Sequence, residues 1–150
     1  MLKLRQSRLG IVVFIFTMLS NPTLAIDNPD SSDLIAEFEA SEKPFIAAIE
    51  NPDNSTRGYA VSYTNYLEFL DRELNTVYKT LYAKLPTDKQ TQLKASQISW
   101  LKYRDQEWSF VENTWTKSDF GSSSSISRGQ YKASIVRDRT IQLMHYAKTF

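Results

Sequence analysis

Residues capable of covalent chemistry are scarce in this chain of 150 residues. Cysteine is absent, which excludes thiol nucleophiles, thiolate metal sites and disulfide bonds. The single histidine, His145, has no second histidine or cysteine with which to bind a metal ion or activate a nucleophile. The four glycines give no phosphate-binding loop. We therefore predict no catalytic residue, no metal site and no cofactor.

Carboxylates are the remaining candidates for acid–base catalysis, which needs two of them held across a cleft. Glu37 and Glu39 are two residues apart, so on a helix they point to different sides. The other carboxylates in the second half of the chain lie among basic residues, as expected for ion pairs. An enzyme is therefore rejected, and the sequence favours a protein that acts by binding.

A set of polar residues lies on or beside apolar stripes that should be buried: Asp71, Asn75, Gln97, Arg104, Asp105 and Arg139. A guanidinium inside a protein needs a carboxylate or carbonyl partner, because an unpaired buried charge is very costly. Asp71 is the nearest plausible partner for Arg104 or Arg139. We predict a structural polar network that fixes the register of the helices, with a recognition surface as the alternative.

The spacing of the apolar residues predicts helices throughout the chain after the leader, with no strand of useful length. From 56 to 85 they recur at intervals of four and three, the stripe of one helix face: Tyr63, Leu67, Leu70, Leu74, Val77, Leu81 and Leu85. The next helix starts at Thr87, with Gln90 completing a capping box, and the last runs from Ser127, where Gln130 completes a second one, to about Lys148. The face predicted for this last helix carries Tyr131, Ile135, Arg139, Leu143, Tyr146 and Phe150. The predicted fold class is all-α: a small up-and-down bundle of three long helices.

Residues 26–54 form an acidic N-terminal segment. Between Asp27 and Asp53 there are eight acidic residues and a single basic residue, Lys43. We predict short helices here, interrupted near Pro44, because proline is tolerated in a first helical turn but not in mid-helix. An acidic arm also argues against a nucleic-acid partner.

Residues 1–25 have the organisation of a secretory signal peptide. Three basic residues precede an apolar run over 9–19, and small residues at 23–25 favour cleavage after Ala25. The run is too short to span a bilayer of roughly 30 Å as a lasting helix. We predict a periplasmic or secreted protein with no stable membrane insertion after cleavage; a retained N-terminal anchor is the alternative.

Two motifs suggest a family: Leu70-Asp71-x-x-Leu74-Asn75-x-x-Tyr78 and Leu93-x-x-x-Gln97-x-x-Trp100-x-x-Tyr103-Arg104-Asp105. With a serine/glycine loop and an arginine in the last helix, they resemble the LprI-like family, small exported helical proteins named for a lysozyme inhibitor. The resemblance spans about residues 59–146, within a predicted domain over 55–150.

The chain departs from the family pattern at two positions. Members usually carry two cysteines, one just after the arginine–aspartate pair and one at the start of the last helix; Trp108 and Tyr131 stand there in this chain. Two aromatic rings that pack together can fill the space that a disulfide would bridge. We therefore predict that Trp108 and Tyr131 lie close together.

The resemblance implies an exported binding protein that inhibits a peptidoglycan-cleaving hydrolase of the lysozyme type, or another peptidoglycan-targeting protein. The candidate contacts lie on or beside a serine-rich loop predicted over 118–127: Ser122, Ser123, Ser124, Ser125 and Arg128. A simple flexible connector is the other interpretation of this loop. The sequence leaves the oligomeric state open.

The alternative function is an envelope immunity or adaptor protein that neutralises a delivered toxin. Tyr103 and Phe110, seven residues apart, form a second aromatic stripe beside the predicted core face, as do Tyr66 and Phe69 on the preceding helix. These aromatics either bind such a partner or bury the acidic N-terminal helices.

Overall fold

Every regular element in residues 33–150, the part that the computed structural model describes, is an α-helix. The three long helices predicted from the apolar spacing are confirmed, and the fold is an all-α bundle. The helices are α1 (Leu34–Glu50), α2 (Thr56–Lys84), α3 (Thr87–Thr114), the one-turn α4 (Lys117–Phe120) and α5 (Ser124–Thr149).

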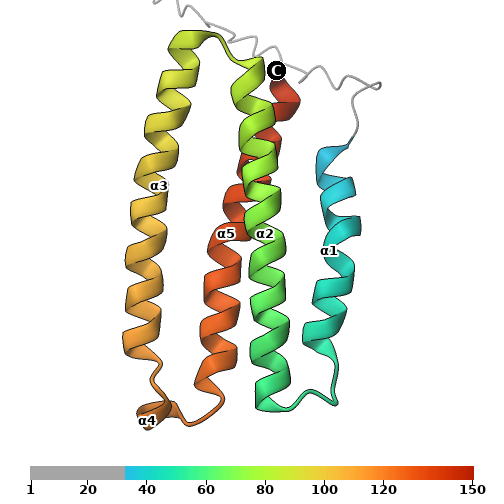
Figure 1. Ribbon diagram of the computed structural model, residues 1–150, viewed down its shortest axis with the longest axis vertical. Helices are drawn as coiled ribbons and strands as arrows, with labels where there is room; N and C mark the ends of the chain where they lie inside the picture. The colour runs from blue at the N-terminus through green and yellow to red at the C-terminus, as the bar shows by residue number, and fades with distance from the viewer. Residues whose placement is uncertain (1–32) are drawn as a thin grey trace, which may run out of the picture.

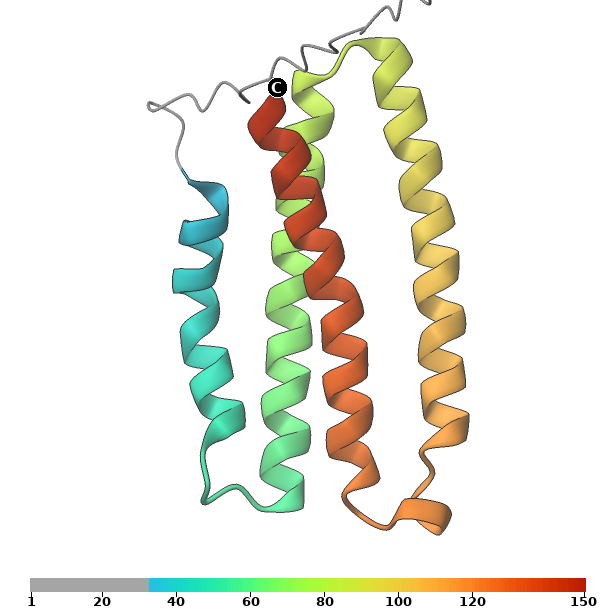
Figure 2. The same cartoon turned by 180° about the vertical axis from the view of Figure 1, so that it is seen from behind.

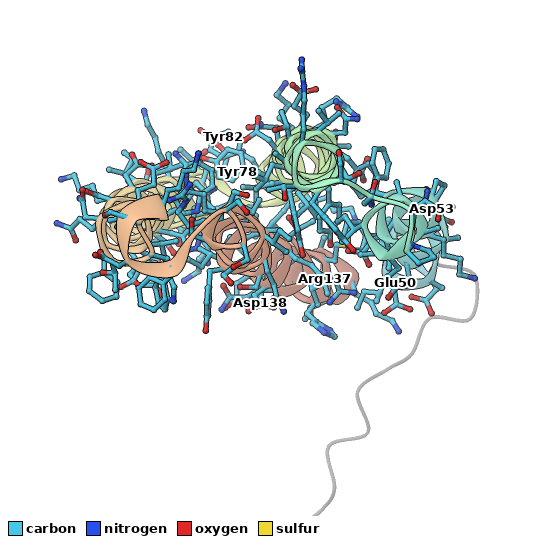
Figure 3. The ribbon with its side chains drawn as sticks, turned by 90° about the horizontal axis from the view of Figure 1, so that it is seen from below. Glu50, Asp53, Tyr78, Tyr82, Arg137 and Asp138 are labelled. Atoms are coloured by element: carbon cyan, nitrogen blue, oxygen red, sulfur yellow. The ribbon has the colours of Figure 1, made fainter. Side chains whose placement is uncertain are left out.

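The long helices run alongside one another, with α2 and α5 in the centre, α1 on one flank and α3 on the other (Figures 1 and 2). Seen from below, the cross-section is elongated, with α1 and α3 at its opposite ends (Figure 3). The two flanking helices therefore reach the core from different sides, and each leaves much of its own surface exposed.

The core lies between α2 and α5. Leu70 and Leu81 of α2 and Leu143 of α5 are completely or almost completely buried. The helices approach closely because α5 presents small residues: a Cβ atom on Gly129 would lie 2.5 Å from Cγ of Tyr63. This corrects the apolar face predicted for the last helix from its larger residues, because three of those are exposed: Tyr131, Tyr146 and Phe150.

The predicted interruption at Pro44 is wrong: α1 is a single helix of 17 residues with this proline inside it. Proline removes one intrahelical hydrogen bond, so other contacts must stabilise the helix. Those contacts are aromatic. Phe38 stacks on Phe69 with ring centroids 5.8 Å apart, and Phe45 stacks on the same ring at 4.5 Å. Asp33 caps the helix by accepting hydrogen bonds from the first-turn amides.

The two predicted capping boxes are also wrong, because neither Thr87 nor Ser127 is the N-cap of its helix. Pro86 occupies the N-cap of α3, and the Nε2 of Gln90 donates to the carbonyl of Tyr82 at 2.9 Å, joining the ends of α2 and α3. The last helix begins at Ser124 rather than Ser127, and the Ser124 hydroxyl donates to the carbonyl of Gly121 at 2.8 Å.

The predicted signal peptide lies outside the described residues. Within residues 33–150, none of the helices combines the length and the apolar character needed to cross a bilayer. The same residues contain no group of three or more histidine, cysteine or carboxylate side chains placed to hold a metal ion.

Candidate functional site

The most buried polar cluster joins α1, α2 and α5, and it was not predicted. Glu42, only 5% exposed, accepts hydrogen bonds from the Nε and Nη2 atoms of Arg137 at 2.7 and 2.9 Å. The hydroxyl of Tyr66 donates to the same carboxylate. Burial, followed by this hydrogen bond, raises the pKa of Tyr66 well above its ordinary value. The hydrogen bond to Glu42 raises the pKa of Arg137. This cluster attaches α1 to the core.

The six residues predicted to form one polar network lie in three separate groups. On the exposed side of α2, the Nδ2 of Asn75 donates to the backbone carbonyl and the carboxylate of Asp71 at 2.7 and 3.1 Å. On α3, Arg104 bonds to its neighbour Asp105 at 2.7 and 2.9 Å. The predicted pairing of Asp71 with Arg104 or Arg139 is therefore wrong, because both arginines find partners elsewhere.

Arg139 forms the third group and connects α5 to α3. The side chain is 7% exposed, and its Nε donates to Oε1 of Gln97 at 3.0 Å. Its Nη1 donates to Oε1 of Gln142 at 2.6 Å and its Nη2 to Oγ of Ser96 at 3.2 Å. Because burial removes water from the guanidinium, the pKa of Arg139 is lowered. The hydrogen-bond acceptors of this cation among the described residues are all neutral oxygens.

Aromatic rings and cations attach the lower half of α3 to α5. The Arg104 guanidinium lies over Trp108 at 4.9 Å, and Nζ of Lys132 from α5 lies 5.3 Å from the centroid of the same ring. Lys132 also pairs with Glu112, which lowers the pKa of that carboxyl. The indole Nε1 of Trp108 is buried without a hydrogen-bond partner.

The predicted contact between Trp108 and Tyr131 is not formed in the described part of the chain. Tyr131 stacks instead on Trp115, with centroids 5.0 Å apart. Phe110 meets the other side of this pair, in an edge-to-face contact with Trp115 at 6.2 Å. Trp108 instead lies next to Lys132, one residue beyond the expected partner Tyr131.

The serine-rich loop is shorter than predicted. Only Ser122 and Ser123 are exposed in the turn, which follows Gly121 at a φ of 68°. Ser124 is 2% exposed, and Ser125 is partly buried in the first turn of α5. Arg128 is also partly buried, and its Nη1 donates to the carbonyl of Trp115 at 2.6 Å. Two of the five candidate contacts, Ser122 and Ser123, therefore face solvent fully.

The second aromatic stripe has different surroundings on the two helices. Tyr66 and Phe69 of α2 are 4% and 5% exposed and pack against α1, as one of the two interpretations of the sequence predicted. Tyr103 and Phe110 of α3 are 50% and 58% exposed. The stripe on α3 is therefore available to another molecule.

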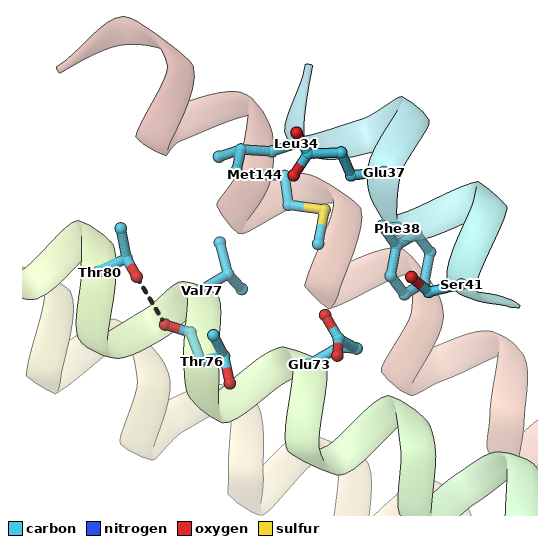
Figure 4. A pocket seen from close by; sticks show the side chains of 9 residues that line it. All are labelled: Leu34, Glu37, Phe38, Ser41, Glu73, Thr76, Val77, Thr80 and Met144. Atoms are coloured by element: carbon cyan, nitrogen blue, oxygen red, sulfur yellow. Dashed lines mark hydrogen bonds between the residues drawn. The ribbon is translucent and has the colours of Figure 1, made fainter. Parts of the chain in front are cut away.

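A cavity of about 220 Å³ opens where α1 meets α2 and α5 (Figure 4). Apolar side chains such as Phe38 and Met144 line it together with the carboxylates of Glu37 and Glu73. A second cavity, of about 310 Å³, lies between α3 and α5, with Arg139 in its lining. The charged groups of the two cavities differ: only carboxylates line the first, whereas the second has the buried guanidinium of Arg139 together with the exposed carboxylate of Asp138.

Comparison with known protein families identifies the family of this chain. Residues 49–143 match the family model described as Lysozyme inhibitor LprI. This range covers α2, α3, α4 and most of α5, and it confirms the resemblance found in the sequence motifs. No curated protein and no solved structure matches the chain.

Proposed function

We propose that this protein, which belongs to the LprI family of lysozyme inhibitors, binds and inhibits a peptidoglycan-cleaving hydrolase of the lysozyme type. The observation that carries the proposal is the family match over residues 49–143. Inhibition takes place by protein–protein contact and involves no catalysis by this chain. The helices that the match covers supply a scaffold with exposed side chains on α3, α5 and the turn between α4 and α5.

The hydroxyls of Ser122 and Ser123 are proposed contacts at the end of the bundle. They lie in an exposed turn that the folded helices hold in place, because Ser124 and Ser125 donate to the carbonyls of Gly121 and Ser122 behind it. Lysozyme-type hydrolases hold their catalytic carboxylates in an open cleft, where a hydroxyl donor is a suitable partner. Ser122 supplies that donor in this proposal, because the Ser123 hydroxyl already donates to the carbonyl of Phe120 at 3.2 Å. Arg128 has a supporting role in this proposal, because it joins α5 to the end of α3 through the carbonyl of Trp115.

The direct test is to titrate the purified, exported protein into lysozymes that are lysing bacterial cell walls. Chicken-type, invertebrate-type and goose-type enzymes form the panel. We expect lysis by at least one of them to fall to zero near an equimolar ratio. Lysis that continues unchanged with all three enzymes at micromolar excess of the protein would overturn the proposal.

The proposed inhibitor works outside the cytoplasm, where such hydrolases meet the cell wall. Export through a signal peptide cleaved after Ala25 is part of the proposal. The N-terminal sequence of the protein recovered from the periplasm or the medium is expected to begin at Ile26. Recovery of the whole leader on a membrane-bound protein would instead indicate a retained anchor.

An adaptor or immunity protein of the envelope is the second candidate, favoured by the exposed rings of Tyr103 and Phe110. Rings with half of their surface in water are suited to binding another protein. The two candidates differ in the partner recovered when the protein is used as bait in an envelope extract. A single delivered toxin, with no lysozyme inhibited in the panel, would favour this second function.

A further inference from the structure

The cavity between α3 and α5 has an unusual electrostatic composition. It is lined by Trp100, Tyr103, Ile135, Asp138, Arg139 and Gln142 and holds about 310 Å³. Its two charged lining residues are Arg139, which is 7% exposed, and Asp138, which is exposed. No ion pair joins these two neighbours, or Arg139 to any other carboxylate of the described residues. The guanidinium is thus a buried positive charge without a negative partner.

The donors of Arg139 are only partly used. A guanidinium has five N–H donors, and three of them bond to Gln97, Gln142 and Ser96. An unpaired charge inside a protein is costly, and neutral oxygens compensate for it less well than a carboxylate does. The contrast with Arg137 on the same helix is direct, because that guanidinium has the buried carboxylate of Glu42. Because this guanidinium is in the lining of the cavity and has no carboxylate partner among the described residues, an anion that enters the cavity can supply one.

Exposed aromatic rings flank the same cavity. Tyr103 lines it from α3, and Phe110, seven residues later, lies on the same side of that helix. On α5, Tyr131 lies one helical turn before the lining residue Ile135. Trp115 contacts both Phe110 and Tyr131, which makes the rings continuous from one helix to the other. Tyrosine, tryptophan and arginine are the residues most enriched at the centres of protein interfaces.

We propose that this cavity receives an acidic side chain of a protein partner, whose carboxylate binds Arg139 while apolar groups beside it pack on Tyr103, Phe110 and Tyr131. In identifying that partner as the inhibited hydrolase, the inference rests on the proposed function. The recognised chemistry is a protruding Asp or Glu with apolar neighbours, because the receiving surface is concave. Charge complementarity selects this occupant over a purely apolar segment.

Asp138 sets the specificity at the rim of the cavity. Asp138 is exposed and lies on the side of the bundle opposite to Tyr78 and Tyr82 (Figure 3). Its carboxylate repels an incoming anion that does not reach the guanidinium, and it accepts a hydrogen bond from an amide next to the bound side chain. Removal of its charge is therefore expected to strengthen the binding of any carboxylate.

The first experiment uses two capped dipeptides, acetyl-Leu-Glu-amide and acetyl-Leu-Gln-amide, and the whole exported protein labelled with ¹⁵N. The Nε–Hε resonance of Arg139 is followed by NMR during each titration. A hydrogen bond to a charged group is stronger than one to a neutral amide, so we expect the glutamate peptide to bind at least about tenfold more tightly than its glutamine analogue. Equal affinity of the two peptides, or no response of this resonance to either, would overturn the proposal.

Substitutions in and near the cavity test which residues bind the peptides. Arg139→Met is expected to abolish the preference for glutamate, and Asp138→Asn to increase it. Tyr103→Ala, which leaves the buried charge in place, is expected to weaken binding of both peptides. Ile98→Ser is the matched control, because Ile98 is 46% exposed on the same helix but does not line the cavity. An effect of Ile98→Ser equal to that of Tyr103→Ala would contradict the assigned surface.

The second experiment separates the pocket from the proposed function. With a lysozyme that the unaltered protein inhibits, Arg139→Met and Tyr103→Ala are expected to raise the concentration for half-inhibition by tenfold or more. Full inhibition by both variants would overturn this docking surface and leave the proposed function intact. If no lysozyme is inhibited by the unaltered protein, the proposed function fails, and the peptide titration alone decides whether the carboxylate pocket exists.

Discussion

The two flanking helices are attached to the central α2–α5 pair by different kinds of contact. α1 has 17 residues, buries Phe38 and Glu42, and stacks its rings on α2. α3 has 28 residues but buries only Leu93 and Val111. Trp100 and Trp108 of α3 pack against the core while partly buried. The polar contacts of α3 with α5 include a guanidinium among neutral oxygens, a lysine over a tryptophan ring and a partly exposed ion pair.

The difference teaches which side of the bundle is structural and which side is free to bind. α1 completes the core, because its large side chains have little surface left in water. α3 keeps Tyr103 and Phe110 about half exposed beside a cavity with a buried cation. A helix that only had to stabilise the fold would bury those rings. Four predictions follow from this contrast, in order of decreasing expected effect on stability.

Truncation of a ring on α1 should destabilise the protein far more than truncation on α3. Phe38 is 2% exposed, so Phe38→Ala leaves a cavity and should lower the free energy of unfolding by about 3–4 kcal/mol. Phe110 is 58% exposed, so Phe110→Ala should change it by less than about 0.5 kcal/mol. Urea unfolding followed by circular dichroism measures both, and equal losses would contradict the contrast.

Removal of the carboxylate that holds α1 should come next in size. Glu42→Ala leaves the Arg137 guanidinium and the Tyr66 hydroxyl without their partner, and should lower the free energy of unfolding by about 2–3 kcal/mol. Glu39→Ala is the matched control: Glu39 lies 4.0 Å from Arg137 but its side chain is 55% exposed, so it should cost less than about 1 kcal/mol. Similar losses in the free energy of unfolding for both variants would show that the burial of Glu42 does not determine its contribution.

Loss of charge at Arg137 and at Arg139 of α5 should affect the free energy of unfolding very differently. Arg137→Met leaves Glu42 buried without a cation and should cost at least about 2 kcal/mol. Arg139→Met removes a charge that has no carboxylate partner, so stability should stay within about 1 kcal/mol or increase. The midpoints of thermal unfolding compare the two. A larger loss for Arg139→Met would mean that this side chain is there for folding rather than for binding.

The smallest effect is a loosening of α3 at acidic pH. The hydrogen bond and the charge of Lys132 lower the pKa of Glu112, so this pair stabilises the fold fully above the ordinary glutamate pKa. That contribution is lost as the pH falls through the lowered pKa of the folded protein. All three tryptophans lie on α3 or at its C-cap, so tryptophan fluorescence reports on this helix. Glu112→Gln should remove the acid-induced change; its persistence would assign the change to another group.

The sequence predicted the parts of the fold in which large apolar residues form one stripe. In α2 the intervals of four and three pointed to Leu70, Leu74, Val77 and Leu81, all of which are buried. In α5 the same reasoning selected Tyr131 and Tyr146, which are exposed. There the close approach to α2 depends on Gly129 and other small residues, and a search for large apolar residues does not detect them.

The polar contacts were less predictable, because they depend on which helices are neighbours. Glu42 and Arg137 are 95 positions apart, and an acidic stretch gives no sign of which carboxylate is buried. Arg104 was expected to reach another helix but pairs with Asp105 beside it. Ser124 was expected in a loop, yet it is the first residue of α5, and its hydroxyl donates to the carbonyl of Gly121. Where a polar side chain has several possible partners, only the packed structure shows which partner it binds.

Hydrogen–deuterium exchange of the protein alone and saturated with an inhibited lysozyme tests the central claim most directly. The claim is that α3 and the adjoining side of α5 bind the hydrolase, while α1 completes the core. We predict slower exchange in the complex around Tyr103, Phe110 and residues 131–142, with α1 unchanged. Protection confined to α1, or exchange that no lysozyme alters anywhere in the protein, would contradict it.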